Sequence, residues 1–269
     1  MILEKSGLPV YLDDETNLLY FGPDVIHNGY GRRVVRDMGN LLYADSISDE
    51  EEAMYDFYRG ITRPEDQELF GRYDFRYDIT VIMPGAVGNE CKKTSGHYHG
   101  FIPQKKSTYP EIYEVIKGKA VYVLQKVNDF ETNTGDLTVE DFMFVEVNEG
   151  QSIVIPPLYG HCSINAGDGP MVFSNIAVVA CPLFYGPVKA NNGMSHYLLK
   201  KDGKLAAVKN PAYGKAPQAK FVTVRDNPDM GIVFNKPVYQ SFIENPEKFN
   251  YLLNPEGHED TMMSMLINK

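Results

Sequence analysis

Short segments rich in β-branched and aromatic residues make up the middle of the chain, between about residues 73 and 200. They alternate with turn-forming glycines and prolines, such as Pro84-Gly85 and Pro156-Pro157. The apolar segments are residues 79–83, 112–115, 120–127, 142–147, 152–155 and 172–179. Many short strands joined by turn residues, with few helical patterns among them, predict an all-β barrel or sandwich.

The segment just before these strands has a helical pattern. Ser48 is a candidate helix cap, Glu51 occupies the third helical position and Gly60 follows the end, which together form a capping-box signature. The apolar stripe at helical spacing consists of Ala53, Met54, Phe57 and Tyr58. We therefore expect one helix here, packed on the barrel within an N-terminal extension over residues 1–72.

Two further patterns follow the barrel strands. The sequence Lys-Asp-Gly-Lys at residues 201–204 separates two apolar segments and predicts a hairpin over residues 197–208. In the tail, Asn245-Pro246 would begin a short helix and Asn254-Pro255 would end it. We expect the extension to be followed by a barrel over residues 73–215 and a helical tail over residues 216–269.

Composition narrows the class of protein. The chain has 269 residues, 43% of them hydrophobic, and 26 Lys and Arg against 36 Asp and Glu give a net charge of −10. This apolar content excludes a disordered chain, and the acidic balance argues against a nucleic-acid-binding surface. Three cysteines without CxxC spacing, no signal-peptide pattern and no run approaching ~20 apolar residues predict a cytoplasmic protein that does not enter a membrane.

Three histidines and a glutamate form the strongest chemical pattern. His97 and His99 stand two residues apart, so on a strand both imidazoles face the same side. Glu111 and Tyr113 repeat that spacing, and a carboxylate in an apolar barrel strand needs a cation or a proton to compensate its burial. His161 begins another strand-like stretch. Three imidazoles and one carboxylate suit Fe(II), Mn, Ni or Zn, with positions left open for a substrate.

At these residues the sequence resembles the cupin superfamily. The first cupin motif, HxH, then Glu, then six residues and Gly, corresponds to His97, His99, Glu111 and Gly118. The second motif is matched by Gly150, Pro156, His161 and Asn165. Leu158 stands where the motif has Gly, and eleven residues, 100–110, separate His99 from Glu111 where the pattern has three or four. The resemblance implies a double-stranded β-helix from which the long insert loops out.

A narrower resemblance is to the cupin-type glucose-6-phosphate isomerases, enzymes of glycolysis and gluconeogenesis known mainly from archaea. It extends over about residues 30–215 and is carried by the stretches GHYH, YPEIYEVIKGK and VIPPLYGH. It implies one divalent metal, with iron expected first and Mn, Ni or Zn as alternatives, bound by His97, His99, Glu111 and His161. It further implies phosphate binding by Thr80, Thr94 and Gly96, and active-site tyrosines at Tyr113, Tyr55 and Tyr185.

Aldose–ketose isomerisation gives these residues a chemical role. A base must move a proton between C1 and C2 of the sugar, and a metal would stabilise the enediolate as a Lewis acid. We expect Glu111, Tyr113 and His97 to take part in catalysis, with Tyr113 orienting or relaying. Glu111 would serve as base, as metal ligand or as both.

The phosphate of such a substrate needs local partners in an acidic chain. Hydroxyls of Thr80 and Thr94, with the backbone N–H of Gly96, would hold it without an arginine. Lys105 and Lys106 on the insert either close over the phosphate or belong to an ordinary solvated loop.

Two other functions use a similar residue set. A cupin dioxygenase would need the metal but no phosphate group contacts, and a non-catalytic sugar-phosphate-binding cupin would normally carry a basic DNA-binding helix pair that is not visible here. Cupin barrels often pair through their sheets, so we expect a homodimer with a phosphorylated sugar as its ligand and no nucleic-acid partner.

Overall fold

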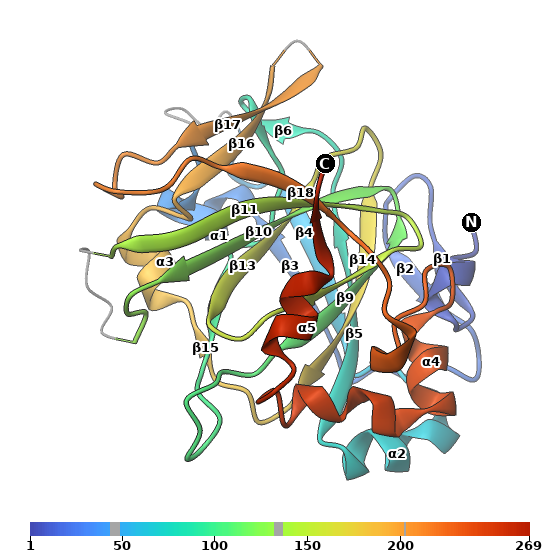
Figure 1. Ribbon diagram of the computed structural model, residues 1–269. Coiled ribbons are helices and arrows are strands. Elements are labelled where there is room, and N and C mark those ends of the chain that lie inside the picture. The colour runs from blue at the N-terminus through green and yellow to red at the C-terminus, as the bar shows by residue number, and fades with distance from the viewer. Residues whose placement is uncertain (44–48, 132–136, 202) are drawn as a thin grey trace.

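Two β-sheets face each other and form the body of the molecule (Figure 1). A computed structural model describes residues 1–43, 49–131, 137–201 and 203–269. One sheet has six strands in the spatial order β12 (Ser152–Ile155), β9 (Glu111–Lys117), β14 (Met171–Val178), β5 (Phe75–Ile82), β4 (Ala53–Arg59) and β3 (Gly29–Val34). The other has five, in the order β13 (Tyr159–Asn165), β10 (Lys119–Val127), β11 (Val139–Asn148), β18 (Lys220–Val224) and β19 (Leu266–Asn268).

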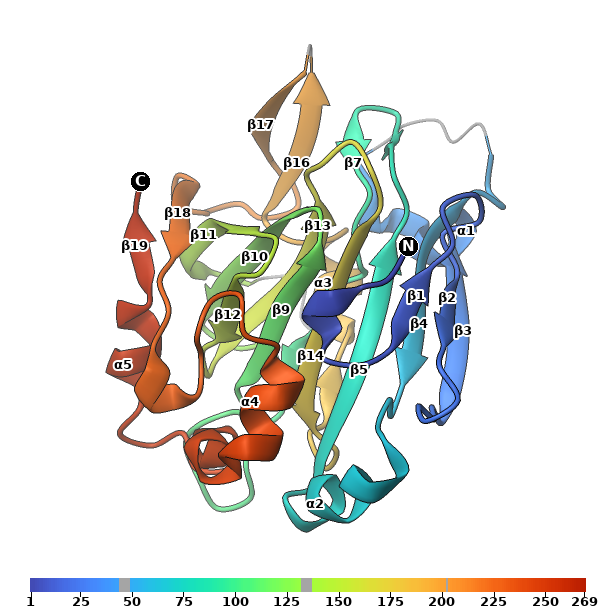
Figure 2. The ribbon, with the colours of Figure 1, turned by 90° about the vertical axis from the view of Figure 1, so that its right-hand side faces the viewer.

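The chain passes repeatedly from one sheet to the other. Strand β9 lies in the six-stranded sheet, the hairpin β10–β11 in the five-stranded sheet, and β12, β13 and β14 then alternate between the two. This connectivity is a double-stranded β-helix, and it confirms the predicted all-β cupin barrel. Figure 2 shows the strands of the six-stranded sheet next to one another, from β12 to β3.

Alternation along the strands separates the interior of the barrel from its outer faces. On β10, Tyr122 and Leu124 pack between the sheets, whereas Val121 and Val123 pack on the outside of the five-stranded sheet. The odd-numbered residues of β5, Tyr77 and Ile79 among them, lie on the outside of the other sheet. Each large side chain buried in this way stabilises the fold by about 1.5–3 kcal/mol. The period of two therefore fixes which residues can face a cavity inside the barrel.

Three small sheets extend this body. They are β1 (Val10–Leu12) with β2 (Leu19–Phe21), β8 (Tyr98–His99) with β15 (Leu183–Phe184), and the sheet β6 (Ala86–Val87), β7 (Glu90–Cys91), β16 (His196–Lys201) and β17 (Lys204–Lys209). Strands β16 and β17 form the hairpin predicted over residues 197–208, of which Asp202 lies outside the described residues.

The helix predicted before the barrel is wrong. Residues 53–59 form strand β4, which pairs with β3 on one side and β5 on the other. Its burial alternates: Met54, Asp56 and Tyr58 are buried, and the residues between them are half-buried. Four apolar residues in this segment are spaced as on one face of a helix. The backbone instead forms hydrogen bonds with the two neighbouring strands, so successive side chains alternate between the two faces of the sheet. Ser48, the predicted cap, lies outside the described residues.

Short helices fill the corners of the structure. The α-helices are α1 (Val35–Met38), α2 (Gln67–Arg72), α3 (Gly186–Ala190), α4 (Val238–Glu244) and α5 (Glu259–Ser264). The 3-10 helices are η1 (Glu4–Ser6), η2 (Gly39–Leu41), η3 (Pro64–Asp66), η4 (Pro228–Met230) and η5 (Pro246–Leu252). Within the described ranges, the helices are all too short or too polar to cross a bilayer.

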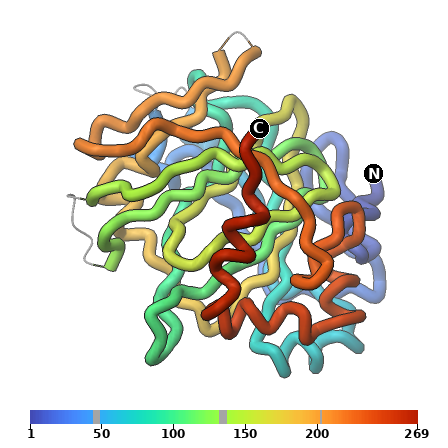
Figure 3. The backbone as a smooth tube through the Cα atoms, viewed as in Figure 1, coloured from blue at the N-terminus to red at the C-terminus, as the bar shows by residue number. Residues whose placement is uncertain are grey.

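The tail is helical only in part. The helix expected after Asn245-Pro246 forms as the 3-10 helix η5, but β18 and β19 of the tail join the five-stranded sheet, which was not predicted. Helix α4 lies beside α2, and its Phe242 is fully buried against Phe70 and Phe75. The trace in Figure 3 ends at β19, which pairs with β18. The tail thus covers an outer face of the barrel and completes its second sheet.

Candidate active site

One cavity inside the barrel brings together every residue for which the sequence predicts a role in catalysis, metal binding or substrate binding. Strands of both sheets contribute to its wall. These residues are Tyr55, Thr80, Thr94, Gly96, His97, His99, Glu111, Tyr113, His161 and Tyr185. They come from segments up to 130 residues apart in sequence, from Tyr55 to Tyr185, so the fold of the barrel and not local sequence assembles them.

Backbone pairing places the three histidines. His97 and His161 exchange two backbone hydrogen bonds, with N–H to C=O distances of 3.1 and 3.0 Å, which tie the start of β8 to β13. Tyr98 between the two predicted ligands points to the other face, where its ring stacks on Phe130. His97 and His99 therefore both face the cavity, as the HxH spacing predicts.

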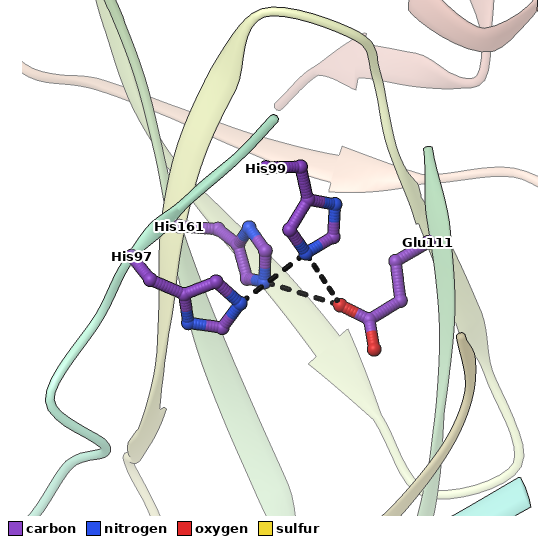
Figure 4. A group of neighbouring side chains, drawn as sticks. All are labelled: His97, His99, Glu111 and His161. Carbon is purple, nitrogen blue, oxygen red and sulfur yellow. Dashed lines mark hydrogen bonds and ion pairs between the residues drawn. The ribbon is translucent and has the colours of Figure 1, made fainter. Parts of the chain in front are cut away.

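The four predicted metal ligands converge on one point (Figure 4). The Nε2 atoms of His97 and His99 lie 3.2 Å apart, and Glu111 Oε2 lies 3.2 Å from His99 Nε2 and 3.4 Å from His161 Nε2. All four ligand atoms, one from each residue, lie within 4.8 Å of one another. A set of three imidazole nitrogens and one carboxylate oxygen at such spacing fits a divalent transition metal.

The backbone of the long insert fixes the orientation of one histidine. The insert folds back on itself, with a bridge between Phe101 and Thr108, before β9 begins at Glu111. At its end, the carbonyl oxygen of Tyr109 lies 2.8 Å from His99 Nδ1 and can accept its proton. In the neutral imidazole that bond leaves the Nε2 lone pair of His99 facing the cluster, which is the arrangement common among metal-binding histidines.

Glu111 is held at both carboxylate oxygens. Its Oε1 accepts a hydrogen bond from Asn175 Nδ2 at 2.7 Å, and its Oε2 accepts one from the Tyr113 hydroxyl at 2.7 Å. Burial alone would raise the pKa of Glu111, but hydrogen bonds and charge from His161 and His99 outweigh it and keep that pKa well below the usual range. Burial and Glu111 together raise the pKa of Tyr113 well above its usual range, so this hydroxyl remains a donor.

The pKa values of His97 and His99 are shifted in opposite directions. Burial, with His161 and His99 nearby, lowers the pKa of His97 well below its usual range. Burial opposes protonation of His99, but hydrogen bonds to Cys181 and Glu111 outweigh it and raise the pKa of His99 to about 10. A proton on His99 and a cation within the cluster would each compensate the negative charge of the same buried carboxylate, that of Glu111. A divalent cation would therefore displace that proton on binding.

The residues predicted to bind phosphate line the same cavity. Thr80 lies on β5 and is 4% exposed, and the Thr94 hydroxyl accepts a hydrogen bond from the Ser163 N–H at 3.0 Å. Gly96 has a φ of +78°, and a Cβ there would lie 3.2 Å from the His161 carbonyl oxygen. Only glycine fits this close approach without strain.

Of the two alternatives for the insert lysines, the structure favours the one in which they lie away from the substrate site. Among the described residues, neither lysine of the insert lines the cavity: Lys105 donates to Asn254 Oδ1 at 2.8 Å, and Lys106 lines a separate hollow beside the Pro156-Pro157 turn. The cavity also contains arginines, Arg59 and Arg76, where the sequence predicted a phosphate site without them. The end of the insert borders the site through Tyr109 and Pro110, but its lysine-bearing part packs toward the tail, which its composition could not show.

Sequence reasoning missed Arg59, Arg76 and Asn175 in the cavity wall. A usable signal existed for the first two, because Arg59 is four residues from Tyr55 and Arg76 is four from Thr80. Even spacing on a strand puts residues on the same face. Asn175 gave no such signal, since its role depends on β14 lying between β9 and β5.

The motif departure at residue 158 has a structural consequence. Leu158 adopts a φ of +69°, the left-handed conformation that the glycine of the motif would take freely. Its backbone N–H donates to the Thr108 hydroxyl at 2.7 Å. The insert therefore helps to hold a turn that costs a leucine about 1–2 kcal/mol.

Comparison with known proteins identifies the family. Residues 32–215 match the family model described as glucose-6-phosphate isomerase (GPI). Glucose-6-phosphate isomerase of Thermococcus onnurineus is 31% identical over 212 residues, which cover 78% of this chain and 97% of that protein. That of Thermococcus litoralis is 32% identical over 140 residues, which cover 52% of this chain and 65% of that protein.

Similar solved structures include a vicilin from Corylus avellana, with a TM-score of 0.35 and 16% identity over 61% of this chain and 37% of that one. Oxalate decarboxylase from Bacillus subtilis has a TM-score of 0.29 and 22% identity over 51% of this chain and 28% of that one. Likeness at this level carries no argument about function. The family match, in contrast, spans more than half of the chain. The chain belongs to the glucose-6-phosphate isomerase family.

Proposed function

We propose that this chain interconverts glucose 6-phosphate and fructose 6-phosphate in the cavity of the barrel, through an enediolate. Membership of the isomerase family supports the reaction. The observation that carries the assignment to this cavity is the convergence of three imidazoles on the buried, doubly hydrogen-bonded carboxylate of Glu111.

A divalent metal fits the chemistry of this cluster. His97, His99, His161 and Glu111 would hold it, because their ligand atoms converge and the carboxylate needs a positive charge beside it. When bound, the metal supplies a Lewis acid for the negative charge that develops on the sugar oxygens. We propose iron as the native ion, with Mn, Ni or Zn as alternatives.

We propose that Glu111 is the base that moves the proton between C1 and C2. Asn175 and Tyr113 each donate to one of its oxygens, so the carboxylate is fixed in place. Oε2 faces the imidazoles of His99 and His161, whereas Oε1 has Asn175 as its one hydrogen-bond donor among the described residues and keeps a lone pair for a proton. The Tyr113 hydroxyl also lies 3.0 Å from His161 Nε2. It can therefore orient the carboxylate and follow its change in charge by strengthening or weakening this hydrogen bond.

Other residues of the cavity can bind the phosphate group of the substrate and exclude water. Thr80 and Thr94 offer hydroxyls and Gly96 a backbone N–H for the phosphate, and the rings of Tyr55 and Tyr185 border the same space. The Tyr185 ring centroid lies 5.3 Å from that of His97, so this tyrosine limits access to the metal ligands. Water excluded by these rings would otherwise quench the enediolate.

The test uses two glutamates of the same strand. Glu111→Gln should lower kcat by about 10²–10⁴-fold, which is the usual contribution of a general base. Glu114→Gln is the matched control, because Glu114 lies on β9 but faces away from the cavity and accepts a hydrogen bond from Val238 N–H at 3.0 Å. Fructose 6-phosphate formation is measured with a coupled assay, together with the metal content of each variant.

The result separates the roles of Glu111. Loss of turnover with the metal retained assigns Glu111 as the base, and loss of both assigns it as an essential ligand. Unchanged kcat in Glu111→Gln contradicts the proposal. Oxygen uptake without isomerase activity in the wild type would point instead to the dioxygenase chemistry that a similar metal site can support.

We also propose that the protein works in the cytoplasm as a homodimer. All three cysteines are free thiols, with Cys91 and Cys162 buried, which suits a reducing compartment. Sedimentation of the purified chain measures the number of subunits directly.

A further inference from the structure

Two arginines share one buried carboxylate in the wall of the cavity. Asp78 has no exposed side-chain surface, and its Oδ2 accepts a hydrogen bond from Arg59 Nη1 at 2.6 Å. Arg76 Nε lies 3.0 Å from both oxygens of Asp78, and the Gly60 N–H donates to Oδ1 at 2.9 Å. Three donors thus surround the carboxylate, and the group of two arginines and one aspartate keeps a net positive charge.

The arginines keep donors that Asp78 does not use. Arg59 Nε and Nη2, and Arg76 Nη1 and Nη2, have no hydrogen-bond partner among the described residues. The side chains are 38% and 37% exposed, and both residues line the cavity. Guanidinium N–H groups with no such partner, in the wall of a cavity, can bind an oxyanion in a forked geometry.

A second Arg–Asp pair, formed between β3 and β4, provides a comparison for this group. Arg32 donates from Nε and Nη2 to the two oxygens of Asp56, at 2.6 and 2.7 Å. Asp56 is as fully buried as Asp78, and Arg32 is 40% exposed. Asp56 alternates on β4 with the cavity-lining residues, so this pair lies on the opposite face of the sheet. The Nε and Nη2 donors of Arg32 are both bonded to Asp56, whereas the Nε and Nη2 donors of Arg59 have no partner among the described residues.

An aromatic platform fixes Arg59. Its guanidinium carbon lies 4.8 Å from the centroid of the Phe57 ring, and that of Arg33 lies 5.7 Å from the same ring. A Cβ at Gly31 would come within 2.4 Å of the Phe57 ring, so glycine at this position makes room for the platform. Cation–π contact and the ion pair with Asp78 together restrict the Arg59 side chain to one orientation.

The position across the sheet matches one end of a hexose phosphate. Asp78 on β5 pairs with Asn175 on β14, which pairs with Tyr113 on β9. Two strand spacings of about 4.8 Å place Asp78 about 10 Å from the Tyr113 backbone. Thr80 stands two residues further along β5 on the same face. A sugar whose C1 and C2 lie at Glu111 can therefore extend its phosphate toward this group.

We infer that Arg59 and Arg76 bind the phosphate group of the substrate beside Thr80, and that Asp78 positions them. The inference rests on the proposed function, since it concerns the same cavity. It explains how a chain with a net charge of −10 holds a phosphate dianion. Asp78 does not contact the substrate; its oxygens are already occupied by three donors.

Kinetics of the metal-loaded full chain test the inference. Arg59→Met and Arg76→Met should each raise KM for fructose 6-phosphate by roughly 10- to 100-fold, the worth of one charge-assisted hydrogen bond, with kcat within a few-fold. The inhibition constant of inorganic phosphate should rise by a similar factor. Arg32→Met is the matched control and should leave both constants unchanged. Asp78→Asn should raise KM while the metal content stays constant, as expected of a positioning residue.

Two outcomes overturn the inference. One is a KM and a phosphate inhibition constant that stay at wild-type values in both arginine variants while the wild type isomerises. The other is an equal loss in Arg32→Met, which would show a general effect on the sheet. If a methionine variant does not fold, Arg59→Lys replaces it and should still raise KM, because lysine keeps the charge but loses the fork. A wild type without isomerase activity contradicts the proposed function instead, and calorimetric titration with inorganic phosphate then decides the role of the arginines.

Discussion

Replacing Glu114 should stabilise the protein at alkaline pH. Glu114 lies on β9 opposite the cavity face, is 1% exposed, and has the Val238 N–H at 3.0 Å and the Ser174 hydroxyl at 3.5 Å as hydrogen-bond donors. Burial raises the pKa of Glu114 to about 8, and these two donors only partly oppose the rise. The carboxylate form is therefore an unfavourable group beneath the first turn of α4.

The direction follows from proton linkage. The folded state binds the proton of Glu114 more tightly than the unfolded state does. The stability that this proton contributes is therefore fully present below about pH 4.5 and is lost as the pH rises through about 8. Between pH 6 and pH 9 the free energy of unfolding decreases by the equivalent of about two pKa units, which is about 3 kcal/mol. Glutamine cannot ionise. The stability of Glu114→Gln relative to wild type should therefore increase by about 3 kcal/mol between pH 6 and pH 9.

Urea unfolding at the two pH values measures this difference. Glu140→Gln, at an exposed position of β11, is the control and should change the free energy of unfolding by less than about 0.5 kcal/mol at either pH. A Glu114→Gln variant whose advantage over wild type does not grow with pH would refute the reasoning. It would show that α4 and Ser174 satisfy the ionised carboxylate.

Three further substitutions have defined outcomes. Tyr113→Phe removes the 2.7 Å hydrogen bond to Glu111 and should lower kcat at least about tenfold with the metal retained; unchanged kcat would exclude an orienting role. Phe242→Ala should cost about 3–5 kcal/mol in urea unfolding, because this fully buried ring joins the tail to β5; a loss below about 1 kcal/mol would mean the tail docks independently of it. Gly96→Ala places a Cβ 3.2 Å from the His161 carbonyl, so metal titration should show weaker binding.

The residues of the metal cluster could be predicted because their signal is local. HxH and Glu-x-Tyr put pairs of side chains on one face of a strand whatever the rest of the fold does. The structure places His97 and His99, and likewise Glu111 and Tyr113, as this parity requires. The distance between the two pairs, and the bridge between His97 and His161, depend on how the sheets face each other.

Other features depended on contacts that no local pattern records. Residues 53–59 satisfy both a helical stripe and a period of two, and only pairing with β3 and β5 decides for a strand. Strand β18 was missed because its alternation is short and its partner, β11, is about 77 residues away. Arg59 on β4 and Arg76 on β5 become one group only through Asp78, which lies two residues from Arg76 on β5 and pairs with both side chains. These are tertiary choices, made by packing and pairing and not by propensity.

Metal dependence of the isomerase reaction tests the central claim most directly. The full chain is treated with a chelator, its metal content is measured, and conversion of glucose 6-phosphate is followed while Fe(II), Mn, Ni or Zn is added back. Turnover should disappear with the metal and return in proportion to the ion bound, saturating at one ion per chain, because His97, His99, Glu111 and His161 form a single cluster among the described residues. Full turnover by metal-free protein would contradict the claim.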